Sequence, residues 1–290
     1  MLGILLIDKP AGITSHDVVN NIRRTLRTKR VGHAGTLDPA ATGLLIVAVG
    51  PATRFLQYLP LEPKEYAGTI TFGTETSTQD GEGEVVSDKP VPTDLADRLA
   101  KVVPQFLGLI RQLPPMYSAI KISGKPLYAY AREGKVLERS ERTIHIESIK
   151  VEGIDGPNVR LRVICSGGTY LRTLAHDLGQ AIGCGAHLSA LNRVRVGRFS
   201  AADAIPLDEV SPDRLVSLRD ALPPMQLLAL SSEQSSSIRE GRSVNFDRQA
   251  SGHIAGLLAP NGSIIGIARV SGNLLQPECV IPIEALHDLH

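Results

Sequence analysis

The stretch NVRLRVICSGGTYLRTLAHDLGQAIG, residues 158–183, changes its hydrophobic period halfway along, and no other segment constrains the fold as strongly. Its first part alternates apolar and polar residues, which predicts a strand with one buried face. After two glycines, the apolar residues recur at helical spacing and predict an amphipathic helix with Thr169 as its N-cap. The chain therefore combines a half-buried strand with an amphipathic helix.

Other segments follow the same two periods. GILLIDKP predicts a short buried strand ended by Pro10, and Ser15 is expected to cap a helix that ends near Lys29. VGHAGTLDPAATG is interpreted as a loop, and LLIVAV after it as a buried strand. Strands are expected at 64–73 and 142–154, and a helical stripe from residue 95 is expected to end or kink at Pro104. Beyond a boundary near Pro224, short alternating segments predict a small second domain.

Composition excludes several classes. The three cysteines lack any CxxC spacing, so neither a disulfide framework nor a zinc site is expected. The apolar runs are too short for a signal peptide or a membrane span, and we expect a soluble cytoplasmic protein. The net charge of +1 hides two basic clusters, RRTLRTKR and the arginines Arg193, Arg195 and Arg198. Each cluster is either a phosphate-binding face or simply the solvated face of a helix or strand.

Asp38 is the first candidate for chemistry. It precedes Pro39, which holds its backbone in an extended, stiff geometry, and it lies in a loop rich in glycine that also contains His33. An aspartate in such a place is either a nucleophile or a turn or helix-capping residue.

Arg172 is the second candidate, because a cation in the first turn of a helix opposes the helix dipole and calls for an anionic partner. That partner is a carboxylate such as Asp38, or a phosphate, unless the arginine is merely exposed. The chain has no GK[ST] and no GxGxxG, and Cys165 fits a core position better than a thiol nucleophile beside His176. A carboxylate nucleophile is the most economical catalytic interpretation.

Five ordered blocks resemble the TruB family of tRNA pseudouridine synthases. They are LLIDKPAGITSHDVV, GHAGTLDPAATGLLIV, KEYAGTITFGTETSTQDGEG, PPMYSAIKISGKPLYAYAREG and CSGGTYLRTLAHDLG. The resemblance implies an α+β pseudouridine synthase fold, in which helices flank a central mixed, mainly antiparallel sheet. It also implies a catalytic domain at 1–225, with an RNA-clasping segment at 114–142, and a β-rich PUA-like RNA-binding domain at 226–290.

The resemblance also implies roles for individual residues. Asp38 is the catalytic aspartate, Tyr66 stacks on the target base, and Arg172 pairs with Asp38. His33 enters the T loop as the nucleotide flips, Leu191 forms a wall of the pocket, and Lys9 and Pro10 buttress the loop. The further residues expected to contact RNA are Gly35, Thr36, Lys121 and Tyr170. One departure is Gly167, where the family is expected to carry a side chain, often lysine.

The implied reaction converts uridine to pseudouridine at position 55 in the T loop of tRNA, without cofactor, metal, guide RNA or obligate protein partner, in a monomer. Asp38 attacks C1′, adds to C6 of the base, or removes the C2′ proton, and the sequence does not choose among these routes. Two alternatives remain: an RNA-folding protein without catalysis, and the same chemistry on another RNA.

Overall fold

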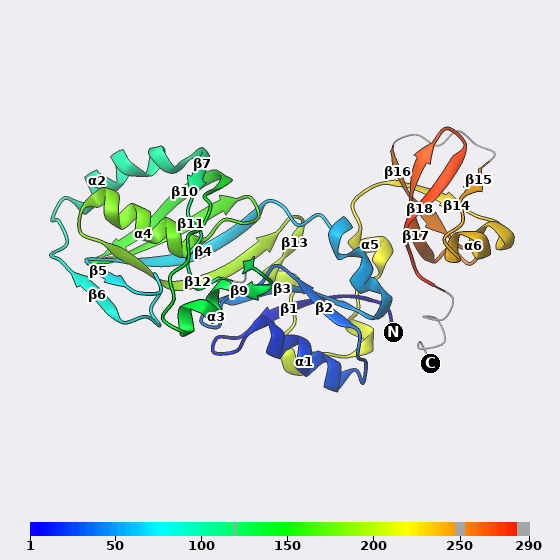
Figure 1. The fold of residues 1–290 in the computed structure, drawn as a ribbon, viewed down its shortest axis with the longest axis horizontal. Coiled ribbons are helices and arrows are strands. Elements are labelled where there is room, and N and C mark those ends of the chain that lie inside the picture. Colours follow the sequence, from blue (N-terminus) through cyan, green and yellow to red (C-terminus); the bar gives the residue numbers. More distant parts are fainter. Residues whose placement is uncertain (119, 247–252, 283–290) are drawn as a thin grey trace. The chain divides into compact units, whose positions relative to one another are not determined.

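The computed structural model describes residues 1–118, 120–246 and 253–282 (Figure 1). The chain forms two compact units, each built from separate stretches of sequence. Unit 1 consists of Met1–Asp38, Leu45–Pro60 and Asp203–His290, and unit 2 of Pro39–Leu44 and Leu61–Ala202. The predicted extent of the terminal domain includes residues 247–252 and 283–290, which lie outside the described residues.

Unit 2 carries most of the large sheet. Its elements are β4 (Lys64–Phe72), β5 (Thr74–Thr76), β6 (Val85–Asp88), α2 (Leu95–Val102), the 3-10 turn Val103–Phe106, β7 (Gly108–Gln112), β8 (Lys121–Ile122), β9 (Lys125–Pro126), α3 (Leu127–Arg132), β10 (Arg142–Asp155), β11 (Asn158–Cys165), α4 (Leu171–Ile182), β12 (Ala186–Val196) and β13 (Phe199–Ser200).

The strand order of the large sheet is β1-β3-β12-β4-β11-β10-β7. The strands from β12 to β7 pair antiparallel, and the first residues of β3 (Thr42–Val49) pair with β12 in parallel, so the sheet is mixed. Helix α4 packs on β12, and α2 packs on α4, with both helices over the same face (Figure 1). The expected mixed, mainly antiparallel sheet with flanking helices is confirmed.

Unit 1 contains two groups of elements. Those near the amino end are β1 (Gly3–Lys9), α1 (Ser15–Thr25), β2 (Val31–Ala34), most of β3 and the 3-10 helix Gly50–Tyr58. The later ones are the 3-10 turns Leu207–Glu209 and Pro212–Arg214, α5 (Leu218–Ala221), β14 (Gln226–Ala229), α6 (Ser232–Arg239), β15 (Val244–Asn245), β16 (Ile254–Leu258), β17 (Ile264–Ser271) and β18 (Leu274–Val280).

Each group in unit 1 has its own apolar core. One face of α1 packs through Val18, Val19 and Ile22 against buried residues of β1 and β3. The second group forms a five-stranded sheet in the order β14-β16-β17-β18-β15, and Ile238 of α6 packs against it. A β-rich carboxyl-terminal part is therefore confirmed.

Four local predictions are wrong. The N-cap of α1 is Thr14, which forms a capping box with Asp17, and the helix ends at Thr25 because Arg27 adopts a left-handed backbone with φ of 48°. The N-cap of α4 is Tyr170, and the Thr169 hydroxyl instead donates to the Ser166 carbonyl. Part of the expected loop at 31–43 is the strand β2, which pairs with β3.

Candidate active site

Tyr66 lies on β4 with only 7% of its surface exposed. Its cross-strand neighbours are Val163 on β11 and Arg193 on β12. Directly opposed residues project to the same face of a sheet, so Arg193 lies on the face of Tyr66. Leu191 pairs with Gly68 on this face, where a Cβ on Gly68 would lie 3.5 Å from Leu191 Cδ1. Tyr66, Leu191 and Arg193 therefore share one face of unit 2.

A β-bulge in β12 separates Arg193 from Arg195. Arg193 pairs with Tyr66 and Arg195 with Glu65, so the extra residue in the bulge sends the two arginines to opposite faces. Arg193 is 1% exposed, and its Nε donates to the Leu44 carbonyl at 2.8 Å. A buried guanidinium belongs neither to a solvated face nor to a surface that binds phosphates, so both interpretations of the second basic cluster are wrong at Arg193.

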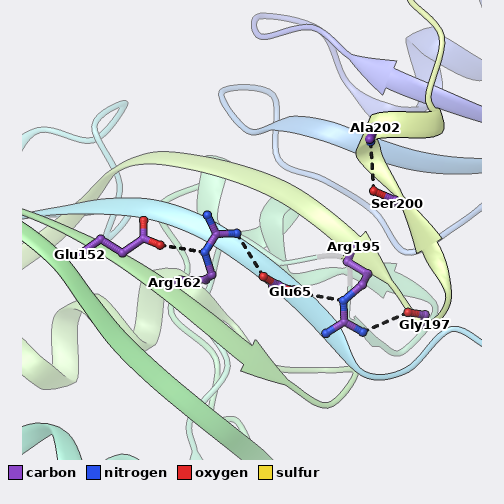
Figure 2. A network of polar contacts seen from close by, with 7 residues as sticks. All are labelled: Glu65, Glu152, Arg162, Arg195, Gly197, Ser200 and Ala202. Carbon is purple, nitrogen blue, oxygen red and sulfur yellow. Dashed lines mark hydrogen bonds and ion pairs between the residues drawn. The ribbon is translucent and has the colours of Figure 1, made fainter.

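Glu65 organises the opposite face of the sheet (Figure 2). Its Oε1 lies 3.1 Å from Arg162 Nη1, and its Oε2 lies 2.9 Å from Arg195 Nε. Arg162 also binds Glu152, with Nε and Oε1 2.8 Å apart. Burial by itself would raise the pKa of Glu65, but the hydrogen bonds from Arg195 and Arg162 outweigh it and lower the pKa below its ordinary value. The network thus ties β4 to β11 and β12 directly beside Tyr66.

Arg172 is the second residue of α4 and is 5% exposed. Its Nη2 donates to the Tyr117 carbonyl at 2.7 Å, and its Nη1 to the Thr78 carbonyl at 3.3 Å. The same Nη1 lies 3.4 Å from Asp80 Oδ2. The alternative of an exposed arginine is therefore wrong, and Asp80 is one anion that offsets the unfavourable helix dipole. The pair between Arg172 and Asp38 stays a prediction.

Asp80 is a site residue that the sequence analysis missed. Its Oδ1 accepts hydrogen bonds from the Thr78 hydroxyl and from the Glu82 backbone N–H, which orient the carboxylate. The Thr76 hydroxyl donates to the Asp80 carbonyl at 2.6 Å. Asp80 lies within the block TETSTQDGEGE, which the pattern marks only as a polar loop. The signal for such a residue in the sequence was Arg172 itself, because a cation in the first turn of a helix requires an anionic partner.

Asp38 belongs to the amino-terminal part of the chain in unit 1, where the backbone before it is fixed. The Ser15 hydroxyl accepts a hydrogen bond from Leu37 N–H at 2.9 Å and lies 3.1 Å from the Leu37 carbonyl. Ser15 thus holds the residue before Asp38 rather than capping α1. Lys9 is fully buried, and its Nζ donates to the Pro10 carbonyl at 2.8 Å. The buttressing role of this pair stays a prediction.

The other residues expected to contact RNA are scattered over the chain. His33 lies on β2 opposite Val47, and Gly35 and Thr36 connect this strand to Leu37. Lys121 is exposed on β8. Tyr170 is half-buried at the start of α4. Whether these residues contact RNA stays a prediction.

Gly167 marks the departure from the family pattern, and the neighbouring carboxylate of Glu62 occupies the space beside it. Gly167 N–H donates to Glu62 Oε1 at 2.9 Å, and a Cβ on Gly167 would lie 2.5 Å from that oxygen. It would also lie 3.8 Å from Lys64 Nζ. Burial, and then the charge of Arg193, lower the pKa of Lys64. A side chain at 167 thus requires Glu62 to move.

Three further observations concern a thiol nucleophile, a metal site and a membrane-spanning helix. Cys165 is a core residue, 1% exposed, and burial raises the pKa of its thiol to about 11. Among the described residues, no three His, Cys, Asp or Glu side chains gather as a metal site would require. In the same part of the chain, every helix is too short or too polar to cross a membrane.

Comparisons with known proteins define the class. Residues 23–171 match the model of the TruB family pseudouridylate synthase N-terminal domain, and residues 172–228 match the tRNA pseudouridylate synthase B C-terminal domain. The protein is thus an enzyme of the pseudouridylate synthase class. The chain belongs to the TruB family.

Similar proteins agree with this assignment. The chain is 48% identical over 223 residues to tRNA pseudouridine synthase B of Opitutus terrae, covering 77% of this chain and 92% of that protein. It is 43% identical over 277 residues to the Geobacter sulfurreducens protein of that name, covering 93% and 90%. A solved Cbf5-Nop10-Gar1 complex contains a chain similar to it, with a TM-score of 0.66, 26% identity and coverage of 97% and 86%. That similarity agrees with the pseudouridine synthase fold.

Proposed function

We propose that this enzyme converts uridine to pseudouridine at position 55 in the T loop of tRNA, with Asp38 as the essential aspartate. Its relatives at 43% and 48% identity are named tRNA pseudouridine synthase B. The observation that supports the proposal most is the burial of the Arg172 guanidinium at the start of α4. A buried cation in that place is costly unless anions face it; Asp80 is one such anion, and we assign the role of a second to the catalytic carboxylate of Asp38.

The reaction needs no external reactant. The bond from N1 of the base to C1′ breaks, the detached uracil turns within the site, and C5 bonds to C1′ while the proton on C5 is lost and N1 regains one. Asp38 starts the sequence at C1′, at C6 or at the C2′ proton. Tyr66 stacks on the base and limits its movement while it is detached, and Leu191 closes the apolar side of the pocket.

The uridine must leave the folded loop before a carboxylate reaches it, which costs a few kcal/mol of unstacking. His33 fills the space that the base vacates in the loop. Tyr66 stacks on the extruded base and recovers part of the free energy lost by unstacking. Lys121 and the segment 114–142 hold the RNA backbone, and the carboxyl-terminal sheet serves as a PUA-like RNA-binding domain. The enzyme acts in the cytoplasm as a monomer on free tRNA, without guide RNA.

The test is mass spectrometry of tRNA after incubation with the protein and derivatisation specific for pseudouridine. We expect product at position 55 with the wild type and none with Asp38→Asn. Binding of tRNA by this variant should stay within about 1.4 kcal/mol of wild type, because the substitution removes charge but little shape. Arg172→Ala should lower the rate far more than the affinity.

The outcomes separate the alternatives. Product formed by Asp38→Asn would sink the mechanism, and product at another position would overturn the substrate assignment alone. Tight tRNA binding by a wild-type protein that forms no pseudouridine would favour a protein that folds RNA without catalysis. Equal losses of rate and affinity in Arg172→Ala would mark Arg172 as a phosphate contact.

A further inference from the structure

Residues 112–117 form a strap across the first turn of α4, where Arg172 lies. At one end of the strap, the Gln112 side chain binds the backbone of Tyr170. At the other end, the Tyr117 carbonyl accepts the hydrogen bond from Arg172 Nη2 at 2.7 Å. Between them, the Leu113 carbonyl lies 3.4 Å from the Thr173 hydroxyl. The strap therefore holds both the backbone of the turn and the guanidinium that the turn carries.

The Gln112 side chain holds Tyr170, the residue that precedes the first turn of α4. Tyr170 is the N-cap of α4, but its side chain makes no capping hydrogen bond to the helix. Tyr170 N–H donates to Gln112 Oε1 at 2.7 Å, and Gln112 Nε2 donates to the Tyr170 carbonyl at 3.0 Å. That carbonyl also accepts the first helical bond, from Leu174 N–H. Because one planar amide binds both polar groups of Tyr170, it fixes the direction in which the helix starts.

The Gln112 amide is buried, which makes its two bonds hard to replace. Its side chain is 2% exposed on β7, and the residue pairs with Arg142 of β10. An apolar side chain there would leave the Tyr170 N–H buried without this acceptor. A buried polar group that loses its partner favours local rearrangement of the backbone.

Residues 114–117 of the strap also belong to the segment 114–142, and later residues of that segment hold the far end of the strap. Ser118, one residue beyond the strap, accepts a hydrogen bond from Tyr128 N–H at 3.1 Å through its carbonyl. Arg139 Nη1 donates to the Pro114 carbonyl at 2.9 Å. Gln112 thus holds the strap at its end on β7, and Arg139 and Tyr128 of the segment 114–142 hold it near its other end.

We propose that Gln112 is a positioning residue, which acts through Tyr170 and the strap to hold the Arg172 guanidinium in its catalytic place. This inference rests on the proposed function of Arg172. It predicts a specific pattern of losses: the rate of the chemical step falls when Gln112 is replaced, whereas tRNA binding does not. A misplaced catalytic group commonly costs about 100-fold in rate, so a loss of about 10-fold to 100-fold is expected.

The test compares Gln112→Met, which removes both hydrogen bonds at similar size, with Ile144→Ala. Ile144 is a buried residue of β10 that makes no side-chain hydrogen bond, so its truncation serves as a control for lost stability. Single-turnover rates at saturating tRNA, tRNA affinity and melting temperature are measured for each variant. We expect Gln112→Met alone to lose rate about 10-fold or more, with affinity within about 2-fold. A rate loss no greater than that of Ile144→Ala would overturn the proposal.

Gln112→Glu provides a second test if Gln112→Met does not fold. A protonated glutamic acid offers the same donor and acceptor as the amide, whereas the carboxylate repels the Tyr170 carbonyl. The rate of this variant relative to wild type should therefore rise as the pH is lowered, and a ratio that does not change with pH would refute the positioning role. Failure of the wild type to form pseudouridine would instead reject the proposed function itself.

Discussion

Replacing Gly43 with alanine is expected to disrupt the pairing of β3 with β12. Gly43 has φ of +93°, and a Cβ there would lie 2.5 Å from the Arg193 carbonyl oxygen and 2.9 Å from its backbone nitrogen. These are backbone atoms of the parallel ladder in which Arg193 pairs with Gly43. No rotation of a side chain can move these backbone atoms away from the new Cβ. The two strands must therefore separate locally.

The expected loss has two parts. A left-handed backbone costs a residue with a Cβ about 1–2 kcal/mol. Separation of the strands also strains the hydrogen bond from Arg193 Nε to the Leu44 carbonyl, and a bond from a charged group is worth about 1.5–3 kcal/mol. Gly43→Ala should thus lower the free energy of unfolding by about 2.5–5 kcal/mol.

Gly183→Ala is the matched control. Gly183 ends α4 with φ of +95°, almost the angle of Gly43, yet a Cβ there would meet nothing within 4 Å. It should therefore lose only the conformational part, about 1–2 kcal/mol. Urea unfolding followed by circular dichroism gives both values from midpoints and slopes. Equal losses in the two variants would refute the argument that close backbone approach, rather than φ, requires glycine at 43.

Two other substitutions or treatments test single features. Glu65→Leu should lower the free energy of unfolding at neutral pH. The pKa of Glu65 is lowered in the folded protein, so this loss of stability should vanish as the pH falls through that lowered pKa. Urea unfolding of both proteins at pH 3 to 7 measures the loss, and a loss that stays constant over this range would contradict the prediction. Cys165 and Cys279, whose thiol pKa values burial raises to about 11, should react slowly with a disulfide reagent at pH 8 until the protein unfolds. Labelling of both at the rate of an unfolded chain would show that they are accessible.

The elements with a clear period could be predicted from the sequence. The strand at 64–72 places its buried residues on one face, the strand at 158–165 alternates buried with more exposed residues, and α4 follows its apolar repeat from Leu171 to Ile182. In each case one face packs against the core, so the hydrophobic pattern and the three-dimensional environment carry the same information. Cys165 was placed in the core for this reason.

The residues that hold the site could not be predicted, because their partners are distant in the sequence. Asp80 binds Arg172 from a polar loop, and Gln112 reaches Tyr170 across 58 residues. Nothing in the local sequence of either residue marks it. Ser15 shows the same limit, since a serine before a helical segment suggests a cap, while its hydroxyl in fact binds Leu37. Local pattern identifies an element but not the tertiary contact that a polar side chain makes.

The pair Arg193 and Arg195 shows why charge along a sequence says little about where that charge acts. In a strand with a regular pleat, both arginines would face the side of Tyr66. Lys64 lies on that same face, and burial and the charge of Arg193 already lower its pKa, so another buried guanidinium would add repulsion. The bulge moves Arg195 to the other face, where Glu65 binds it. One extra residue therefore lets β12 keep a buried cation beside Tyr66 while its neighbour stabilises the sheet from the opposite side.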